Sequence, residues 1–336
     1  MKTLITGATG FVGAAVSREL LKKGHKIKAL VRETSNLKNL KNLNVEIVYG
    51  DLRNRSSLRN GLKDCDYLFH VAADYRLWVP NPNEIYENNV KGTENLMNEC
   101  LKQKIKKIVY TSSVAVLGKP INSEIADEDT PVDYSQMIGH YKKSKFLAEE
   151  KVKEIFRKKK LPVVIVNPAA PIGPRDIKPT PTGKMILDAS MKKIPAYLDT
   201  GLNIVHVNDV AVGHMQAFKK GKLGERYILG GENLSFKKIL EIIADLCGHN
   251  PPKFRLPKKP LYPIGLLFEI FAKLFSLKNP MLTLDMIRMA EKKMFFSSLK
   301  AEKEFNYKFT SAKKAIKDAI KWYIDNGYCR NVKLVW

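Results

Sequence analysis

The segment KTLITGATGFVG, at residues 2–13, constrains the fold of this chain more than any other. A short apolar strand runs directly into three glycines, Gly7, Gly10 and Gly13, and a helical pattern follows. Glycine permits a tight turn and a close backbone approach, while the free N–H groups and the dipole of a helix N-terminus attract an anion. The segment therefore predicts a loop that binds the pyrophosphate of a dinucleotide, although glycines also occur in plain strand-to-helix connections.

Apolar segments alternate with amphipathic ones through the first half of the chain. Strands are predicted at Lys2–Thr6, Lys26–Val31, Val45–Tyr49, Tyr67–Val71, Lys107–Ser112 and Pro162–Asn167. Helices are predicted at Phe11–Lys23, Ser56–Leu62, Ile85–Gln103 and His140–Lys159. This alternation is typical of βαβ units, so we expect an α/β fold, a Rossmann doubly wound parallel sheet with helices on both faces.

The pattern changes after the sixth strand. Residues 168–182 contain five Pro, one Gly and isolated charges, and they predict a loop that leaves the sheet. Next we expect a strand at Ile204–Val207, a helix at Asn208–Lys220 capped by Asn208, a strand at Tyr227–Leu229, and a mainly helical remainder. Residues 1–168 and about 203–230 are thus expected to form the nucleotide-binding domain, and residues 169–202 and 231–336 a smaller, mainly helical C-terminal substrate domain.

The chain carries a formal net charge of +24. The excess is almost entirely lysine, 46 Lys against 12 Arg, and it is spread along the sequence rather than gathered on an arginine-rich, aromatic face. We therefore expect a small-molecule substrate and no nucleic acid partner, with weak contact to an anionic membrane surface as an alternative. Four cysteines without metal-ligand spacing predict a reduced, cytoplasmic setting and no bound metal. Separately, we expect the protein to be a monomer or a homodimer.

Tyr141 and Lys145 lie four residues apart in the long helical segment, and therefore on one face of it. A free phenol has a pKa of about 10, and a neighbouring ammonium in a partly desolvated site is the simplest way to lower that pKa. Thr111, Ser112 and Ser113 stand at the carboxyl end of a predicted parallel strand, where ligands bind in open α/β sheets. A hydroxyl there is placed to hydrogen-bond a substrate oxygen, and a turn-forming serine is the alternative.

Several motifs together resemble one protein family. TGATGFVG, YTSS followed by YKKSK, and NPAAPIGP resemble the extended short-chain dehydrogenase/reductase family, of the NAD-dependent epimerase/dehydratase type. Over most of its length the chain is similar to dihydroflavonol reductase-like members. Among these it is most similar to the hopanoid-associated sugar epimerase group, whose pattern matches HVAADYRLW, VHVNDVAVGH, YILGGEN and KKMFFSS.

The resemblance implies roles for the matching residues. Tyr141 would be the acid/base, and Lys145 would bind the nicotinamide ribose and lower the pKa of the tyrosine. Ser113 would polarise the substrate oxygen, and Asn89 would support the site through its helix. Besides Tyr141 and Lys145, the residues implied to bind the cofactor are Gly7, Thr9, Gly10, Phe11, Val12, Gly13, Asp51, Leu52, Ala72, Ala73 and Pro168. Of these, Asp51 and Leu52 would contact adenine, with a helix-capping Asp51 as the alternative.

The end of the second strand bears on the choice of cofactor. Arg32 occupies a position at which an acidic residue would hold the ribose 2′-hydroxyl of NAD. Arginine binds a phosphate through paired hydrogen bonds, so NADP is favoured. Glu33, the next residue, keeps NAD as an alternative.

The substrate side carries weaker signals. Candidate substrate contacts are Asp74, Tyr75 and Arg76 after the fourth strand, and Ile172 and Arg175 in the Pro-rich loop. His206 is expected to be structural rather than catalytic. The strongly apolar segment Leu261–Phe275 is expected to pack in the core of the substrate domain. The alternatives are that this segment lines an apolar substrate channel or that it contacts a membrane interface.

These features predict an NAD(P)-dependent oxidoreductase that interconverts a carbonyl and an alcohol by hydride transfer, with Tyr141 as acid/base. The same residues would serve a sugar or nucleotide-sugar epimerase with a retained cofactor, linked to hopanoid or isoprenoid lipid synthesis. A cofactor-sensing or membrane-associated binding protein without turnover is a third alternative. The intact Tyr141 and Lys145 count against it.

Overall fold

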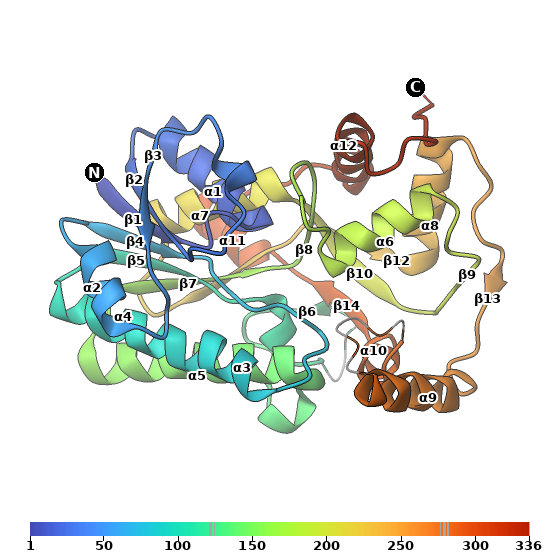
Figure 1. The fold of residues 1–336 in the computed structure, drawn as a ribbon, viewed down its shortest axis with the longest axis horizontal. Coiled ribbons are helices and arrows are strands. Elements are labelled where there is room, and N and C mark those ends of the chain that lie inside the picture. Colours follow the sequence, from blue (N-terminus) through green and yellow to red (C-terminus); the bar gives the residue numbers. More distant parts are fainter. Residues whose placement is uncertain (121–122, 124, 276, 278–279, 281, 336) are drawn as a thin grey trace.

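The computed structural model describes residues 1–120, 123, 125–275, 277, 280 and 282–335 (Figure 1). Its centre is a seven-stranded sheet with the order β11-β7-β5-β4-β1-β2-β3, in which every pair of neighbours is parallel. The strands are β1 (Lys2–Thr6), β2 (Lys26–Val31), β3 (Val45–Tyr49), β4 (Tyr67–His70), β5 (Lys107–Thr111), β7 (Val163–Pro168) and β11 (Arg226–Leu229). The predicted doubly wound Rossmann sheet is confirmed.

Helices cover both faces of this sheet (Figure 1). One face carries α1 (Phe11–Lys22), α7 (Val207–Lys220) and α11 (Leu299–Phe305), and the other carries α2 (Arg55–Leu62), α4 (Gly92–Lys102) and α5 (Gly139–Lys159). Alternation along β5 divides its side chains between the two faces. Val109 packs in the core cluster with α1 and α7, whereas Ile108 and Tyr110 pack in the cluster with α4 and α5.

One predicted helix is interrupted. The segment 85–103 contains α3 (Asn83–Tyr86), a single π-helical turn η2 (Glu87–Lys91) and then α4. A π turn adds one residue to the helical ring and is often found at functional sites. Side-chain periodicity did not reveal this interruption.

A second, smaller sheet lies beside the first. It has the order β12 (Glu232–Ser235), β10 (Gly201–His206), β14 (Lys293–Phe296) and β6 (Ile125–Ala126), with β8 (Ala170–Ile172) also paired to β10. A short pair joins β9 (Ala196–Tyr197) to β13 (Phe254–Arg255). Helices α6 (Pro181–Ser190), α8 (Phe236–Cys247) and α12 (Ala312–Asp325) supply the apolar core next to this sheet.

Two local predictions in this region were wrong. The expected loop 168–182 contains β8 and the start of α6, because β8 gains its partner from β10, far along the chain. The helix expected at Asn208 begins at Val207 and is capped by His206, whose Nδ1 accepts a hydrogen bond from the Asn208 N–H at 3.0 Å. His206 thus has a structural role, as expected.

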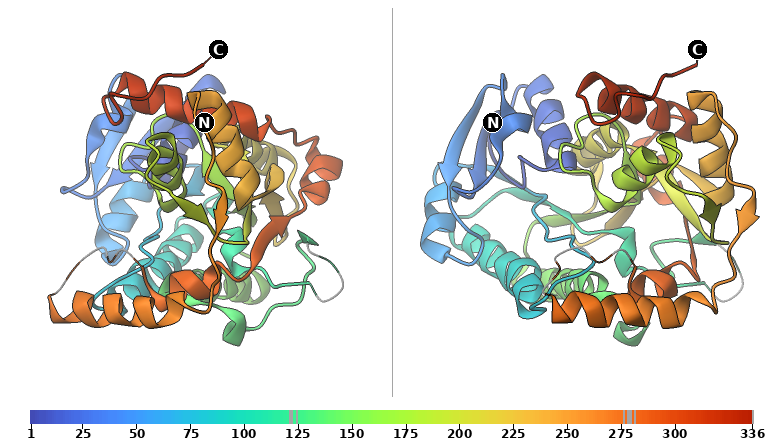
Figure 2. Two further views of the ribbon diagram at one scale, coloured as in Figure 1. Left: turned by 90° about the vertical axis from the view of Figure 1, so that its right-hand side faces the viewer. Right: turned by 45° about the vertical axis from the view of Figure 1, so that its right-hand side comes forward.

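The remaining elements include α9 (Leu261–Leu274) and α10 (Leu284–Met289), which lie along the lower edge of the molecule (Figure 2). Short 3₁₀ turns occur at η1 (Leu37–Leu40), η3 (Val114–Val116) and η4 (Tyr134–Gln136). Core packing was expected for α9, but its Leu267 is 67% exposed, so this prediction was wrong. Within the described ranges, no helix combines the length and the apolarity that crossing a membrane requires.

Candidate active site

The glycine loop between β1 and α1 packs backbone against backbone. Gly7 has φ +72°, and a Cβ atom there would lie 2.6 Å from the Ala72 nitrogen. A Cβ atom on Gly13 would lie 2.0 Å from the Gly7 carbonyl oxygen. Gly10 precedes α1, and no described side chain caps the first N–H groups of that helix. The glycines therefore let the loop pack tightly on itself and on the segment after β4, while the first N–H groups of α1 stay uncapped, which fits a pyrophosphate group.

The other loop residues differ in what they can offer. Thr9 accepts a hydrogen bond from Asn39 through its carbonyl oxygen, at 3.1 Å, which anchors the loop. Phe11 is 9% exposed and packs in the core, so only its backbone N–H can meet a phosphate. Val12 is half-buried against the same core. The contribution of this segment to cofactor binding would therefore come from its backbone.

The predicted cofactor residues follow the carboxyl ends of adjacent parallel strands. In spatial order, Asp51 follows β3, Arg32 follows β2, Gly7 follows β1, Ala72 and Ala73 follow β4, Ser113 follows β5, and Pro168 ends β7. The sheet therefore brings them to one edge. From Arg32 to Ser113 the edge spans three strand spacings, ~14 Å in total. Such an edge suits an extended ligand with one end near β2 and the other near β5.

The β2–β3 end of the edge is rich in charge. Asp51 accepts hydrogen bonds from Arg53, Nε to Oδ1 at 2.9 Å and Nη2 to Oδ2 at 2.7 Å. These bonds lower the pKa of Asp51 below its usual value, and nearby Arg32 adds a smaller effect. The alternative role of Asp51 as a helix cap is excluded, since Asn54 caps α2. Leu52 lies under the start of α4, in contact with Gly92.

Ser113 and Tyr141 face each other across the β5 end of the edge. Ser113 follows β5 and is anchored twice: its carbonyl oxygen accepts from Asn167 Nδ2 at 3.0 Å, and its Oγ accepts from the Ala115 N–H at 3.1 Å. Tyr141 lies in the first turn of α5, with the Ser113 side chain close enough to affect its pKa. Burial raises the pKa of Tyr141, and the Ser113 hydroxyl opposes this rise.

Lys145 is buried one turn further along α5, with 2% of its surface exposed. Its Nζ donates to the Thr111 carbonyl oxygen at 2.9 Å and to the Tyr110 hydroxyl at 3.3 Å, and lies 4.9 Å from the centre of the Tyr110 ring. Burial lowers the pKa of Lys145 to about 8, against the opposing effect of Glu149. The expected lowering of the Tyr141 pKa by Lys145 is not met here, because the desolvation of the phenol dominates.

Sequence reasoning missed the polar groups beneath Lys145. His70 on β4 shares hydrogen bonds with Thr6 Oγ1 at 2.7 Å and Thr93 Oγ1 at 3.0 Å, and its ring stacks on Tyr110. Burial lowers the pKa of His70 to about 3, so this histidine is neutral. Tyr110 was detectable in principle. Strand alternation places it on the same face as Ile108, the face that α5 covers.

Asn89 connects two parts of the site. It lies in the π turn η2, is 3% exposed, and donates through Nδ2 to the Asp74 carbonyl oxygen and the Ser144 Oγ, each at 2.9 Å. Its Oδ1 accepts from the Asp74 N–H at 2.7 Å. Ser144 in turn donates to the Tyr141 carbonyl oxygen at 2.9 Å. Asn89 therefore ties the loop after β4 to the turn of α5 that carries Tyr141.

The predicted substrate residues after β4 differ in their contacts. Asp74 and Arg76 form an ion pair at 2.6 Å, and Glu84 also pairs with Arg76. Tyr75 is 39% exposed, and its pKa is raised by burial and then by Asp176, which follows β8. The loop after β4 thus lies near enough to the loop after β8 for the charge of Asp176 to affect Tyr75.

The two candidates in the Pro-rich segment have different positions. Arg175 is exposed, with φ +75°, and its carbonyl oxygen accepts from Asn39 at 3.3 Å. Ile172 is 1% exposed and packs in the core with Ile186. The pairing of β8 with β10 accompanies this burial, and the contact of Ile172 with substrate stays a prediction.

Comparison with known proteins agrees with this architecture. Residues 3–230 match the family model described as the NAD dependent epimerase/dehydratase family. A Synechocystis protein provisionally named dihydroflavonol 4-reductase is 40% identical over 97% of this chain and 95% of its own length. Sterol demethylase protein B of Methylococcus capsulatus is 33% identical over 97% and 99%. The crystal structure of gox2253 superposes with a TM-score of 0.87 at 50% identity, covering 97% of this chain and 98% of that one. The chain belongs to the NAD-dependent epimerase/dehydratase family, within the extended short-chain dehydrogenases/reductases.

Proposed function

We propose that this member of the family interconverts a carbonyl and an alcohol with a nicotinamide cofactor, and that Tyr141 is its acid/base. The carrying observation is the position of Ser113 at the same sheet edge as the glycine loop, with Tyr141 close enough to be affected by it and the buried Lys145 one turn further along α5. When bound, the cofactor would supply or accept the hydride. A phenol kept protonated by burial supports a role as the proton donor in reduction.

The residues around Tyr141 support a simple division of tasks in the reductive direction. The Ser113 hydroxyl would donate a hydrogen bond to the substrate carbonyl oxygen. Tyr141 would transfer its phenolic proton to that oxygen as hydride reaches the carbon, which yields the alcohol and a phenolate. Lys145 uses two donors on Thr111 and Tyr110, so its third N–H would serve a ribose hydroxyl. Its positive charge, close by in the same buried region, would favour the phenolate.

Tyr141→Phe tests the assignment, with NADPH oxidation against a panel of carbonyl compounds as the assay. We expect turnover to fall by at least a hundredfold, because the proton donor is lost while the ring is kept. Tyr49→Phe, at a tyrosine that is 56% exposed, is the matched control and should keep wild-type turnover. Retention of more than a tenth of wild-type turnover by Tyr141→Phe would exclude the assignment.

We further propose NADP as the preferred cofactor. Arg32 and Arg53 both lie near Asp51, so two guanidinium groups stand at the end of the edge where the adenosine ribose would lie. An arginine pair favours a ribose 2′-phosphate over a bare hydroxyl. Arg32→Ala should weaken NADPH binding by at least tenfold in calorimetry and change NADH binding less than threefold. Equal losses for both nucleotides would exclude a phosphate-binding role for Arg32.

We propose net reduction rather than epimerisation. The chain is 40% identical to a protein with a reductase name and 33% identical to one named for sterol demethylation, each over nearly its full length. A reductase consumes NADPH in proportion to product. An epimerase regenerates its bound nucleotide in every cycle. Absorbance of NADPH during turnover distinguishes the two, since product formation without net NADPH loss would establish the epimerase.

A further inference from the structure

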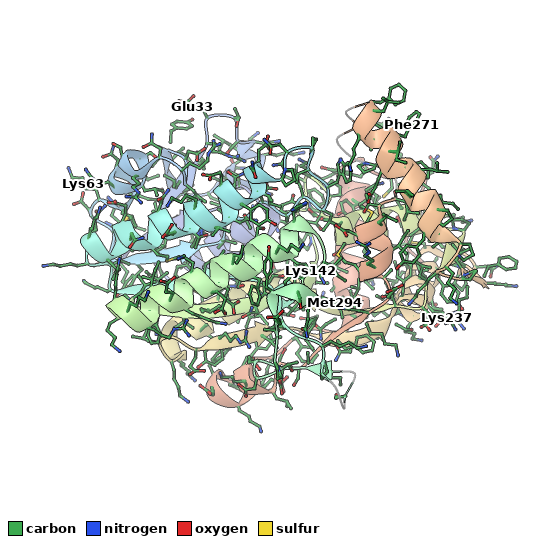
Figure 3. All side chains as sticks on the ribbon, turned by 90° about the horizontal axis from the view of Figure 1, so that it is seen from below. Glu33, Lys63, Lys142, Lys237, Phe271 and Met294 are labelled. Carbon is green, nitrogen blue, oxygen red and sulfur yellow. The ribbon has the colours of Figure 1, made fainter. Side chains whose placement is uncertain are left out.

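Helix α9 presents its large apolar side chains to solvent. Figure 3 labels Phe271 on this helix, whose end projects beyond the rest of the molecule. The most exposed apolar side chains of α9 are Ile264 at 44%, Leu266 at 47%, Leu267 at 67%, Ile270 at 55%, Phe271 at 54% and Leu274 at 74%. Phe275, just after the helix, is 57% exposed. A contiguous apolar face of this kind on a soluble chain indicates an interaction surface.

The packing of α9 is the reverse of that of an ordinary surface helix. Its buried positions are small, Gly265 and Ala272, whereas the bulky residues point outward. A Cβ atom on Gly265 would lie 2.7 Å from Ile287 Cδ1, so the helix lies close against α10. Glu269 is turned toward the protein, where its Oε1 accepts from the Leu284 N–H at 2.8 Å. The arrangement therefore places the apolar residues outside and the carboxylate of the helix inside.

Basic residues flank the exposed face. Residues 253–275 contain five basic side chains and one acidic side chain, the inward-turned Glu269; the basic ones are Lys253, Arg255, Lys258, Lys259 and Lys273. Of these, Arg255 is paired with Asp199. Phe254 and Leu256 extend the apolar surface, at 76% and 40% exposure. Apolar residues interleaved with lysine, on a chain of net charge +24, match the composition of helices that lie on anionic lipid.

The helix also adjoins the candidate active site. The Trp78 indole, in the loop after β4, donates to the Leu277 carbonyl oxygen at 3.2 Å, just beyond α9. At the start of α5, a Cβ atom on Gly139 would lie 3.1 Å from Asp285 Oδ2 of α10. Leu277, just after α9, therefore contacts the loop that holds Asp74, and α10 lies against the start of the helix that carries Tyr141.

We propose that α9 docks this protein on an anionic lipid surface, with Leu267, Phe271 and Leu274 at the acyl boundary and the flanking lysines at the headgroups. A second copy of the chain is the less favourable occupant. Pairing two such faces would bring five basic side chains from each copy together, whereas anionic lipid neutralises them. The contact would be interfacial. Docking does not depend on the proposed reductase activity, because none of its residues belongs to the machinery described above.

Vesicle sedimentation of the full chain tests the proposal. The probes are vesicles of phosphatidylglycerol and phosphatidylcholine in equal parts, and vesicles of phosphatidylcholine alone, at low and high salt. The double variant L267E/F271E places two carboxylates on the face. The matched control is L223E/L299E, at leucines that are 48% and 57% exposed elsewhere on the molecule. Circular dichroism melting verifies that each variant is folded.

We expect the wild type to bind the anionic vesicles at least tenfold more tightly than L267E/F271E, and to bind neutral vesicles or vesicles at high salt much less. L223E/L299E should stay within twofold of the wild type. In a separate variant, F271W, the tryptophan emission should shift to the blue on anionic vesicles only. Equal binding by the wild type and L267E/F271E, or no binding by the wild type at low salt, would overturn the proposal. So would a lipid-free dimer in sedimentation equilibrium that L267E/F271E abolishes, because that face would then be an interface between copies.

Discussion

Lys145 should destabilise the folded protein at neutral pH. The residue is 2% exposed, and among the described residues its ammonium forms no ion pair; the partners of the ammonium are a carbonyl and a hydroxyl oxygen. Lowering its pKa from 10.5 to about 8 corresponds to about 3 kcal/mol, at 1.36 kcal/mol per pKa unit. Replacing Lys145 with Met, which has a similar shape and no charge, should therefore raise the free energy of unfolding at pH 7 by about 1–3 kcal/mol.

The sign of the pH dependence follows from the direction of the pKa shift. Below pH 8 both the folded and the unfolded chain carry the charge, so the penalty is fully present. Between pH 8 and 10.5 the folded chain releases the proton first, and the wild type gains stability as the pH rises. From pH 7 to 9.5 this gain amounts to about 2 kcal/mol. The advantage of Lys145→Met should shrink by that amount over the same range.

Urea unfolding of both proteins at pH 7, 8, 9 and 9.5 measures this difference. Lys63→Met, at an exposed lysine (Figure 3), corrects for the loss of one positive charge. We also expect Lys145→Met to lose at least a hundredfold in turnover, as a stabilising change at a functional residue. An unchanged free-energy difference between pH 7 and 9.5 would refute the claim that desolvation sets the pKa of Lys145. A variant less stable than the wild type at pH 7 would show that the hydrogen bonds to Thr111 and Tyr110 outweigh desolvation.

Three further predictions follow from single contacts. Gly13→Ala should lower the free energy of unfolding by about 1–3 kcal/mol and abolish nucleotide binding in calorimetry, because its methyl would lie 2.0 Å from the Gly7 carbonyl oxygen. Gly61→Ala should do neither, because its methyl would meet the flexible end of Leu30 at 3.1 Å and the end of Leu4 at an ordinary contact distance of 3.7 Å. Asn89→Ala should lower kcat at least tenfold and keep the affinity for NADPH within threefold of the wild type. The substitution removes the hydrogen bonds to Asp74 and Ser144 but leaves the glycine loop intact. Equal losses in kcat and in NADPH affinity would contradict a positioning role for Asn89. Glu149→Gln should destabilise the protein by about 3 kcal/mol at pH 7, because the buried carboxylate pairs with Arg226. Folding lowers the pKa of Glu149, because the effect of burial is outweighed by Lys153, Ser112 and Arg226 together. The difference in unfolding free energy between the wild type and Glu149→Gln should therefore shrink in urea titrations as the pH falls below 4.5. An undiminished difference at pH 4 would contradict this prediction.

Much of the fold could be predicted because its signals are local. The strands β1, β2 and β3 were predicted at their observed bounds, and β4, β5 and β7 within one residue. Each is an apolar run bounded by polar or turn-forming residues, and the helices between them indicate that the strands run parallel to one another. The failures occur where a partner lies far along the chain. Strand β8 has the composition of a loop and becomes a strand only because β10 offers it hydrogen bonds.

The candidate site divides in the same way. By itself the sequence determined the glycine turn, the pairing of Tyr141 with Lys145, and the placement of Ser113 at a strand end, because a few consecutive φ/ψ choices set these spacings. Only the tertiary structure decided that Tyr110 and Thr111 hold the Lys145 ammonium, that Asn89 joins two segments, and that Ile172 is core. It also decided which face of α9 meets the protein. Periodicity shows that a helix has an apolar side, but whether that side is covered depends on the shapes of elements remote in sequence, here the close contact of Gly265 with α10.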